Sequence, residues 1–224
     1  HYYLLHQAGP ANVGSGCTQS VARVPVNGAS PAMERPLPQA FLDISGKTQI
    51  GDGRARCVGV ALCDADGNAR NSFRQGERAV FYYEFALNGD IGVPIAGIVI
   101  ANDRGIIVFG KHNWQYDVAP VGTVGSNCVV ACRQEVSLDL GVGEYTFEIG
   151  LAAVSPDDWG RRKTVSHEEA EGLFRRLCHV SAVASFSVGY ADSEGIAVLT
   201  HHGVANLPGS MKIVAQAGVH ETYA

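Results

Sequence analysis

Residues 78–87 read RAVFYYEFAL, and the type of protein can be argued outward from this segment. Large apolar side chains recur at every second position, so an extended backbone places Phe81, Tyr83, Phe85 and Leu87 on one face. An amphipathic helix would instead space its apolar residues by three and four. The stretch therefore predicts a β-strand with one face in a hydrophobic core.

Strand patterns continue on both sides of this stretch. VPIAGIVI (93–100) and GIIVFG (105–110) flank Asn102-Asp103-Arg104-Gly105, which is typical of a hairpin turn. RARCVGVALC (54–63) ends at the turn DADGN (64–68), and its alternation puts Val58, Val60 and Leu62 on one face.

Further along the chain, QEVSLDL (134–140) and GEYTFEIGL (143–151) alternate between apolar and polar residues. SFSV (185–188) and two runs near 195–200 and 210–215 complete the predicted strands. One helix is predicted after a capping box at Ser166 and Glu169. Its apolar face would carry the residues Ala170, Leu173, Phe174 and Leu177.

Many short strands and one short helix predict an all-β fold, an antiparallel sandwich or jelly roll over residues 41–224. Residues 1–40 are rich in Gly, Pro, Ala and Ser, and we expect an N-terminal arm or linker, partly irregular. We expect the core to include Tyr83, Phe85, Val136, Leu138, Phe147 and Ile149.

Composition excludes several classes of function. The 224 residues carry a formal net charge of −5 and no Lys/Arg cluster, so nucleic acid and anionic membranes are poor partners. The longest apolar run, near Val93–Ile100, is too short to span a bilayer, so no membrane insertion is expected. SGKT (45–48) is not a phosphate-binding loop, because Phe41 stands where the motif requires glycine.

The six cysteines form no C-x-x-C pair, and the adjacent His201 and His202 would point to opposite faces of a strand. We therefore predict no metal site, no cofactor and no disulfide, in a reducing compartment. The carboxylates offer an alternative, a glycan-active enzyme. However, Glu144 and Glu148 lie on the polar face of a strand, and Glu168 and Glu169 fit a helix N-terminus.

Two loops combine tryptophan with planar polar residues. Trp114 lies in KHNWQYD (111–117), and Trp159 lies in SPDDWGRR (155–162). Sugars stack on aromatic rings and hydrogen-bond to amides and guanidinium groups. We predict Trp114 as a stacking platform, and its alternative role is to plug the end of the sandwich. The predicted carbohydrate-binding residues are Trp114, Asn113, Gln115 and His112, with Trp159 and Arg161 as a second choice.

Residues 55–210 resemble the C-terminal domain of the nucleotide-binding subunit of O-antigen ABC exporters, the Wzt C-terminal family. The shared features are D-x-D-G, F-x-x-G-E, P-I-x-G-I, G-I-x-V-F-G before an Asn, L-x-x-G-x-Y, and a closing LPG. The chain departs from the family at FGKHN (109–113), where one extra residue stands. The resemblance implies an immunoglobulin-like or jelly-roll sandwich, often paired in dimers.

The resemblance also implies a function, which is non-catalytic binding of the non-reducing end of an O-antigen-type polysaccharide before export. We expect a cytoplasmic homodimer at the inner face of the bacterial inner membrane. The ATPase domain and the membrane subunit of the exporter would be its partners in the full-length protein. The alternatives are a glycan-active enzyme or accessory domain with groove carboxylates, and a structural dimerisation domain.

Overall fold

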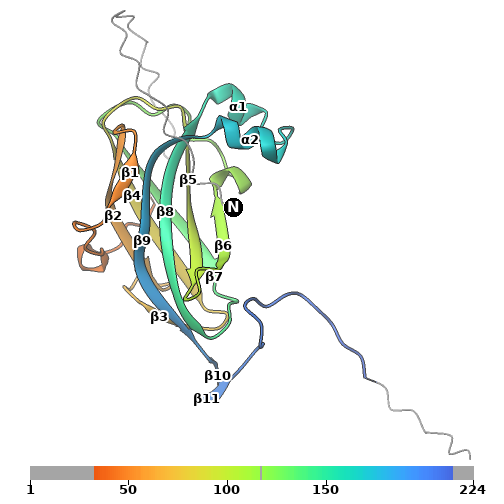
Figure 1. Ribbon diagram of the computed structural model, residues 1–224. Coiled ribbons are helices and arrows are strands. Elements are labelled where there is room, and N and C mark those ends of the chain that lie inside the picture. Colours follow the sequence, from red (N-terminus) through yellow and green to blue (C-terminus); the bar gives the residue numbers. More distant parts are fainter. Residues whose placement is uncertain (1–32, 117, 214–224) are drawn as a thin grey trace, which may run out of the picture.

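The computed structural model describes residues 33–116 and 118–213, and two β-sheets packed face to face dominate them (Figure 1). The larger sheet has the strand order β1-β9-β8-β5-β6, with β3 beside β9, and the smaller sheet has the order β2-β4-β7. All strand pairs are antiparallel except β3 and β9, which pair in parallel. The predicted antiparallel β-sandwich is therefore confirmed, with one short parallel addition.

The bounds of the elements follow the predicted strands closely. The larger sheet consists of β1 (Gln49–Gly51), β3 (Ser72–Arg74), β5 (Val93–Asn102), β6 (Ile107–His112), β8 (Gly143–Val154) and β9 (Arg175–Gly189). The smaller sheet consists of β2 (Ala55–Cys63), β4 (Arg78–Leu87) and β7 (Val129–Ser137). The remaining elements are β10 (Ala191–Ser193), β11 (Ile196–Val198), η1 (Pro38–Ala40), η2 (Asn113–Gln115), α1 (Pro156–Gly160) and α2 (His167–Leu173).

The core lies between the facing sheets, as the alternation predicted. Phe81 of β4 meets Phe147 of β8 edge to face, with 5.0 Å between ring centroids, an arrangement that aromatic pairs favour. The six residues expected in the core are all buried: Tyr83, Phe85, Val136, Leu138, Phe147 and Ile149.

A β-bulge corrects the predicted facing of β2. The register against β4 shifts between Cys57 and Gly59, so the side chain of Val58 is 48% exposed instead of facing the core. Val60 and Leu62 share the inward face as predicted, and Cys57 takes the inward position that was expected of Val58. A bulge inserts one residue into one strand, and alternation in the sequence alone carries no sign of it.

Two short α-helices are described, where one was predicted. The predicted helix is α2, and its capping box between Ser166 and Glu169 is confirmed. It ends at Leu173, so the expected face does not reach Leu177, which belongs to β9. The missed helix is α1, where Ser155 caps the first turn and proline follows at the first helical position.

Both ends of the described chain lie outside the sandwich layers. Residues 33–40 precede β1, and Arg35 bonds to Glu84 on β4. Most of the predicted arm, residues 1–32, lies outside the described residues. Of the two predicted C-terminal runs, the first contains β11, while residues 210–213 form no strand and 214–215 lie outside the described residues. Within the described ranges, no helix is long and apolar enough to cross a membrane.

A glutamine bridges the two sheets at each lateral edge of the sandwich. At one edge, the side-chain amide of Gln49 (β1) exchanges hydrogen bonds of 2.8 and 3.0 Å with the backbone of Cys57 (β2). At the opposite edge, Gln134 (β7) donates to the carbonyl of Lys111 (β6) at 3.1 Å. Side-chain amides can act as donor and acceptor together, so each one substitutes for backbone pairing between strands of different sheets.

Candidate functional site

An aromatic cluster covers one end of the larger sheet, where η2 follows β6. We define it by Trp114, Trp159, Phe174 and His112. The Trp114 ring lies edge to face with Trp159 at 5.9 Å and with Phe174 at 5.1 Å between centroids. The cluster rests on apolar residues of β5 and β8, namely Val93, Ile95, Ala152 and Val154.

Asn113 fixes the position of η2 on the sheet. Its Oδ1 accepts the backbone N–H of Ala96, and its Nδ2 donates to the carbonyl of Pro94, both at 2.9 Å. The β5–β6 ladder ends at the Gly97–His112 pair, so the Asn113 side chain takes over where β6 no longer pairs with β5. Asn113 therefore positions Trp114, and both polar atoms of its amide already bond to the backbone of β5.

Gly97 allows β6 to approach β5 closely at this point. A Cβ atom on Gly97 would lie 2.5 Å from the Cβ of His112, far closer than two carbon atoms tolerate. Any larger residue would push His112 and the following η2 away from the sheet. The geometry of the aromatic cluster therefore depends on a residue without a side chain on the neighbouring strand.

His112 is a neutral member of the aromatic cluster. Burial lowers its pKa to about 4, because a charged imidazolium is costly where water is excluded. Its ring meets Phe174 edge to face at 5.4 Å. The backbone N–H of His112 donates to Oε1 of Gln115 at 3.0 Å, which closes the turn into η2.

Trp159 lies beneath the exposed layer of the aromatic cluster. Its side chain is 4% exposed, and the guanidinium of Arg162 lies 4.6 Å above its ring. The neighbouring Arg161 bonds to Asp158 at 2.8 and 3.0 Å. Trp159 therefore supports Trp114, and Arg161 is a partly exposed donor at the rim.

The structure brings most predicted site residues to one place. Trp114 is half-buried and Gln115 is exposed, while Asn113 turns toward the backbone of β5. Sequence reasoning missed the part that Phe174 takes in the cluster. The available signal was its place on the apolar face of the predicted helix, which that reasoning assigned to packing only.

Two carboxylates near the cluster, Asp158 and Glu169, lack the raised pKa of a glycosidase acid. Hydrogen bonds from Ser155 and then Arg161 lower the pKa of Asp158, and the Ser166 cap lowers the pKa of Glu169. A general acid requires a raised pKa. Among residues 33–116 and 118–213, no three His, Cys, Asp or Glu side chains gather as metal ligands.

Comparisons with known proteins agree with this architecture. The model of the Wzt C-terminal domain family matches residues 46–160, so the chain belongs to that family. A crystal structure of the C-terminal domain of Wzt superposes with a TM-score of 0.58 at 16% identity, covering 80% of this chain and 93% of that one. The family is the non-catalytic, carbohydrate-binding module of O-antigen ABC exporter ATPases.

A second solved structure, a Northeast Structural Genomics Consortium target named SoR45, gives a TM-score of 0.32 at 13% identity. It covers 67% of this chain and 95% of that chain. A search of the curated proteins found no significant match.

Proposed function

We propose that this domain binds the non-reducing end of an O-antigen-type polysaccharide for export by an ABC transporter. The observation that carries the proposal is family membership over residues 46–160. The acidic net charge of −5 supports a neutral or weakly charged ligand over nucleic acid. The domain would act in the cytoplasm, at the inner face of the inner membrane. The ATPase domain and the membrane subunit of the exporter would be its partners.

The aromatic cluster is the proposed binding site. The half-buried Trp114 offers its remaining exposed surface for stacking on a sugar ring. Gln115 is exposed, and its Nε2 has no bond to any described residue, so this group is a free donor for a hydroxyl. Arg161 supplies a second donor at the rim. Asn113, Trp159 and His112 hold Trp114 in place.

Affinity at such a site is weak by nature. Each hydrogen bond exchanged with water nets about 1 kcal/mol, and one exposed ring adds a similar amount. Binding of one site is therefore expected on the order of micromolar to millimolar. Two sites in a dimer would strengthen binding to a repeating polymer through effective concentration.

We also propose that the domain is a homodimer joined through its C-terminal segment. Leu207, Met211 and Ile213 are each about 80% exposed, and the segment leads away from the sandwich (Figure 1). A row of exposed apolar side chains on an extended segment is suited to packing on a second copy. Dimers are expected by light scattering at tens of micromolar, and the double substitution Leu207→Asp, Met211→Asp should yield monomers. A monomeric parent domain would contradict this part of the proposal.

The binding test is titration of the domain with purified O-polysaccharide, followed by calorimetry. Trp114→Ala should abolish detectable binding, and Trp114→Tyr should retain part of it, because tyrosine still offers a ring. Tyr190→Ala is the matched control, since Tyr190 is 52% exposed and lies outside the aromatic cluster.

Thermal unfolding of each variant separates binding from folding. If Trp114→Ala unfolds the domain, the tryptophan plugs the end of the sandwich and the proposed site is wrong. If the folded variant binds with unchanged affinity, the site lies elsewhere, and the face near Tyr82 and Glu84 is the next to test. If no polysaccharide binds the parent domain, a structural dimerisation domain is the better description.

A further inference from the structure

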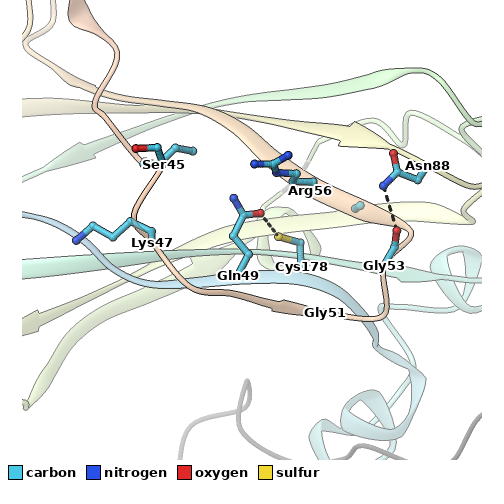
Figure 2. Close-up of a pocket in the computed structure, with 10 residues that line it drawn as sticks. Ser45, Lys47, Gln49, Gly51, Gly53, Arg56, Asn88 and Cys178 are labelled. Carbon is cyan, nitrogen blue, oxygen red and sulfur yellow. Dashed lines mark hydrogen bonds between the residues drawn. The ribbon is translucent and has the colours of Figure 1, made fainter.

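A polar groove opens at the edge of the sandwich where β1 and β2 lie in different sheets. It has a volume of about 370 Å³ and continues into a second hollow of about 410 Å³. The two hollows share Ile44, Ser45, Gln49 and Arg56. Gly51 and Gly53 form part of the wall (Figure 2).

Gln49 closes the floor of the groove. Its Oε1 accepts from the Cys57 backbone at 2.8 Å and from the Cys178 thiol at 3.4 Å, and its Nε2 donates one of its two hydrogens to the Cys57 carbonyl. Figure 2 shows the Arg56 side chain above this floor, on the side of Ser45. The floor is therefore rigid, and the groups available to a ligand are those above it.

Two cations without a carboxylate partner line this groove. Lys47 donates to the backbone carbonyl of Ala182 at 2.6 Å, and Arg56 has no bonded partner among the described residues. Eight other arginines of the described residues pair with carboxylates, namely Arg35, Arg54, Arg70, Arg74, Arg78, Arg133, Arg161 and Arg175. Arg104, Arg162 and Arg176 also have no such pair, but they do not line this groove. In a chain with a net charge of −5, the two cations without carboxylate partners make the lining of the first hollow positive.

The neutral groups of the groove define the rest of the ligand. Ser45 presents a hydroxyl, and the Asn88 Oδ1 remains an acceptor, because its Nδ2 already donates to the Gly53 carbonyl at 3.1 Å. Ile44 and Ala55 add apolar surface. One guanidinium, one ammonium, a hydroxyl and an amide together fit a sugar ring that carries a single carboxylate.

Asp43 lines the second hollow and does not line the first. The backbone N–H of Ser45 donates to its Oδ1 at 2.9 Å, and this bond lowers its pKa, so it stays charged at neutral pH. Asp43 therefore repels a carboxylate in the second hollow, whereas the lining of the first hollow contains Arg56 and Lys47 and no acid.

We propose that this edge groove is a second saccharide subsite, specific for an acidic sugar unit whose carboxylate pairs with Arg56, while Lys47 adds positive charge at another part of the same groove. The inference rests on the proposed function, since it treats the ligand as a polysaccharide. The groove lies beside β1, and Trp114 follows β6, at opposite edges of a five-strand path. Four strand spacings place them roughly 20 Å apart, so the two sites are independent.

The experiment follows amide chemical shifts of the labelled domain during titration with glucuronate, glucose and inorganic phosphate. Glucuronate should shift residues 44–56, and glucose should not. Arg56→Gln should weaken glucuronate binding at least tenfold, and Lys47→Gln should weaken it less. Arg104→Gln, at the tip of the β5–β6 hairpin, is the matched control and should bind like the parent.

The outcomes separate this inference from the proposed function. Equal shifts with glucose, an unchanged affinity of Arg56→Gln, or tighter binding of phosphate than glucuronate would each overturn the acidic-sugar subsite. Trp114→Ala should leave the glucuronate shifts unchanged. If Trp114→Ala keeps polysaccharide binding while Arg56→Gln loses glucuronate, the aromatic cluster fails as the main site and the groove stands.

Discussion

A bridging glutamine lies at each lateral edge of the sandwich, but the two edges differ in how far that glutamine is covered. At the β6–β7 edge, Gln134 is 8% exposed and accepts from the Tyr83 hydroxyl at 3.1 Å while donating to Lys111 and Tyr116. At the β1–β2 edge, Gln49 is only half-buried and forms the floor of the polar groove. We call the β6–β7 edge closed, because aromatic side chains cover its bridging amide, and we call the β1–β2 edge open.

The comparison shows that a sandwich can form a binding surface at an edge where the bridging amide stays accessible to solvent, without a deep cavity. At the closed edge, Gln134 donates to the Tyr116 hydroxyl, and the Lys111 ammonium lies 4.1 Å above the Tyr116 ring. The open edge leaves a solvated groove between the sheets. The open edge therefore places accessible polar groups, such as Ser45 and Asn88, in the same groove as Arg56.

The largest expected effect comes from breaking the closed edge. Gln134→Leu leaves the Tyr83 hydroxyl and the Lys111 carbonyl without partners, and a buried unpaired polar group is costly. We expect the free energy of unfolding to fall by about 2–4 kcal/mol, measured by chemical denaturation. Adding Tyr83→Phe should recover part of the loss, because it removes the unpaired hydroxyl. A loss under about 1 kcal/mol would mean that water reaches this edge.

The matching substitution at the open edge should cost less. Gln49→Leu frees the N–H and carbonyl of Cys57, yet the groove lets water reach both groups. We expect a loss of about 1–2 kcal/mol in the same denaturation measurement. A loss equal to that of Gln134→Leu would remove the distinction between the two edges.

Alkaline pH tests how dry the floor of the open edge is. Burial raises the pKa of the Cys57 thiol from 9.0 to about 12. The unfolded chain therefore loses this proton first, and the free energy of unfolding falls as pH rises through the window from 9 to 12. At pH 10 this proton release lowers the free energy of unfolding by about 1 kcal/mol. Cys57→Ala should therefore reduce the loss of stability between pH 9 and pH 10 by that amount, measured by chemical denaturation at each pH. An unchanged pH dependence would show a hydrated thiol.

The smallest effect is expected at the surface of the closed edge. Lys111→Met removes the cation above the Tyr116 ring and keeps the length of the side chain. An exposed cation–π contact contributes about 0.5–1 kcal/mol, so the melting temperature should fall by only a few degrees. A loss of stability as large as that of Gln134→Leu would mean that the Lys111 cation, and not the buried amide of Gln134, stabilises this edge.

The period-two alternation predicted the strands well, because a strand of a two-layer sandwich buries one face and exposes the other. It located β4, β8 and the β5–β6 hairpin, and it named core residues such as Phe147. It failed at Val58, because the bulge in β2 depends on how β4 pairs with it. Alternation also gives no indication of the helix α1, which is marked instead by the capping sequence S-P-D-D at its start.

For the candidate site, the sequence predicted which loops matter but not how their side chains divide the work. Loop composition identified Trp114 and Trp159, and the structure places their rings in contact. Asn113 carries the same amide as Gln115, yet Asn113 bonds to the backbone of β5 while Gln115 remains exposed. A residue type states which bonds are available, and only position determines which are made.

The strands, the facing of most core residues and the family could be predicted from the amino-acid order, because alternation and turn residues act over a few neighbouring positions. Which edge is closed and which is open depends on contacts between strands that are distant in the sequence. Gln49 and Gln134 are the same residue type, and neither is marked by its local sequence. Their roles depend on Cys57 and Lys111, which reach them from other strands of the fold.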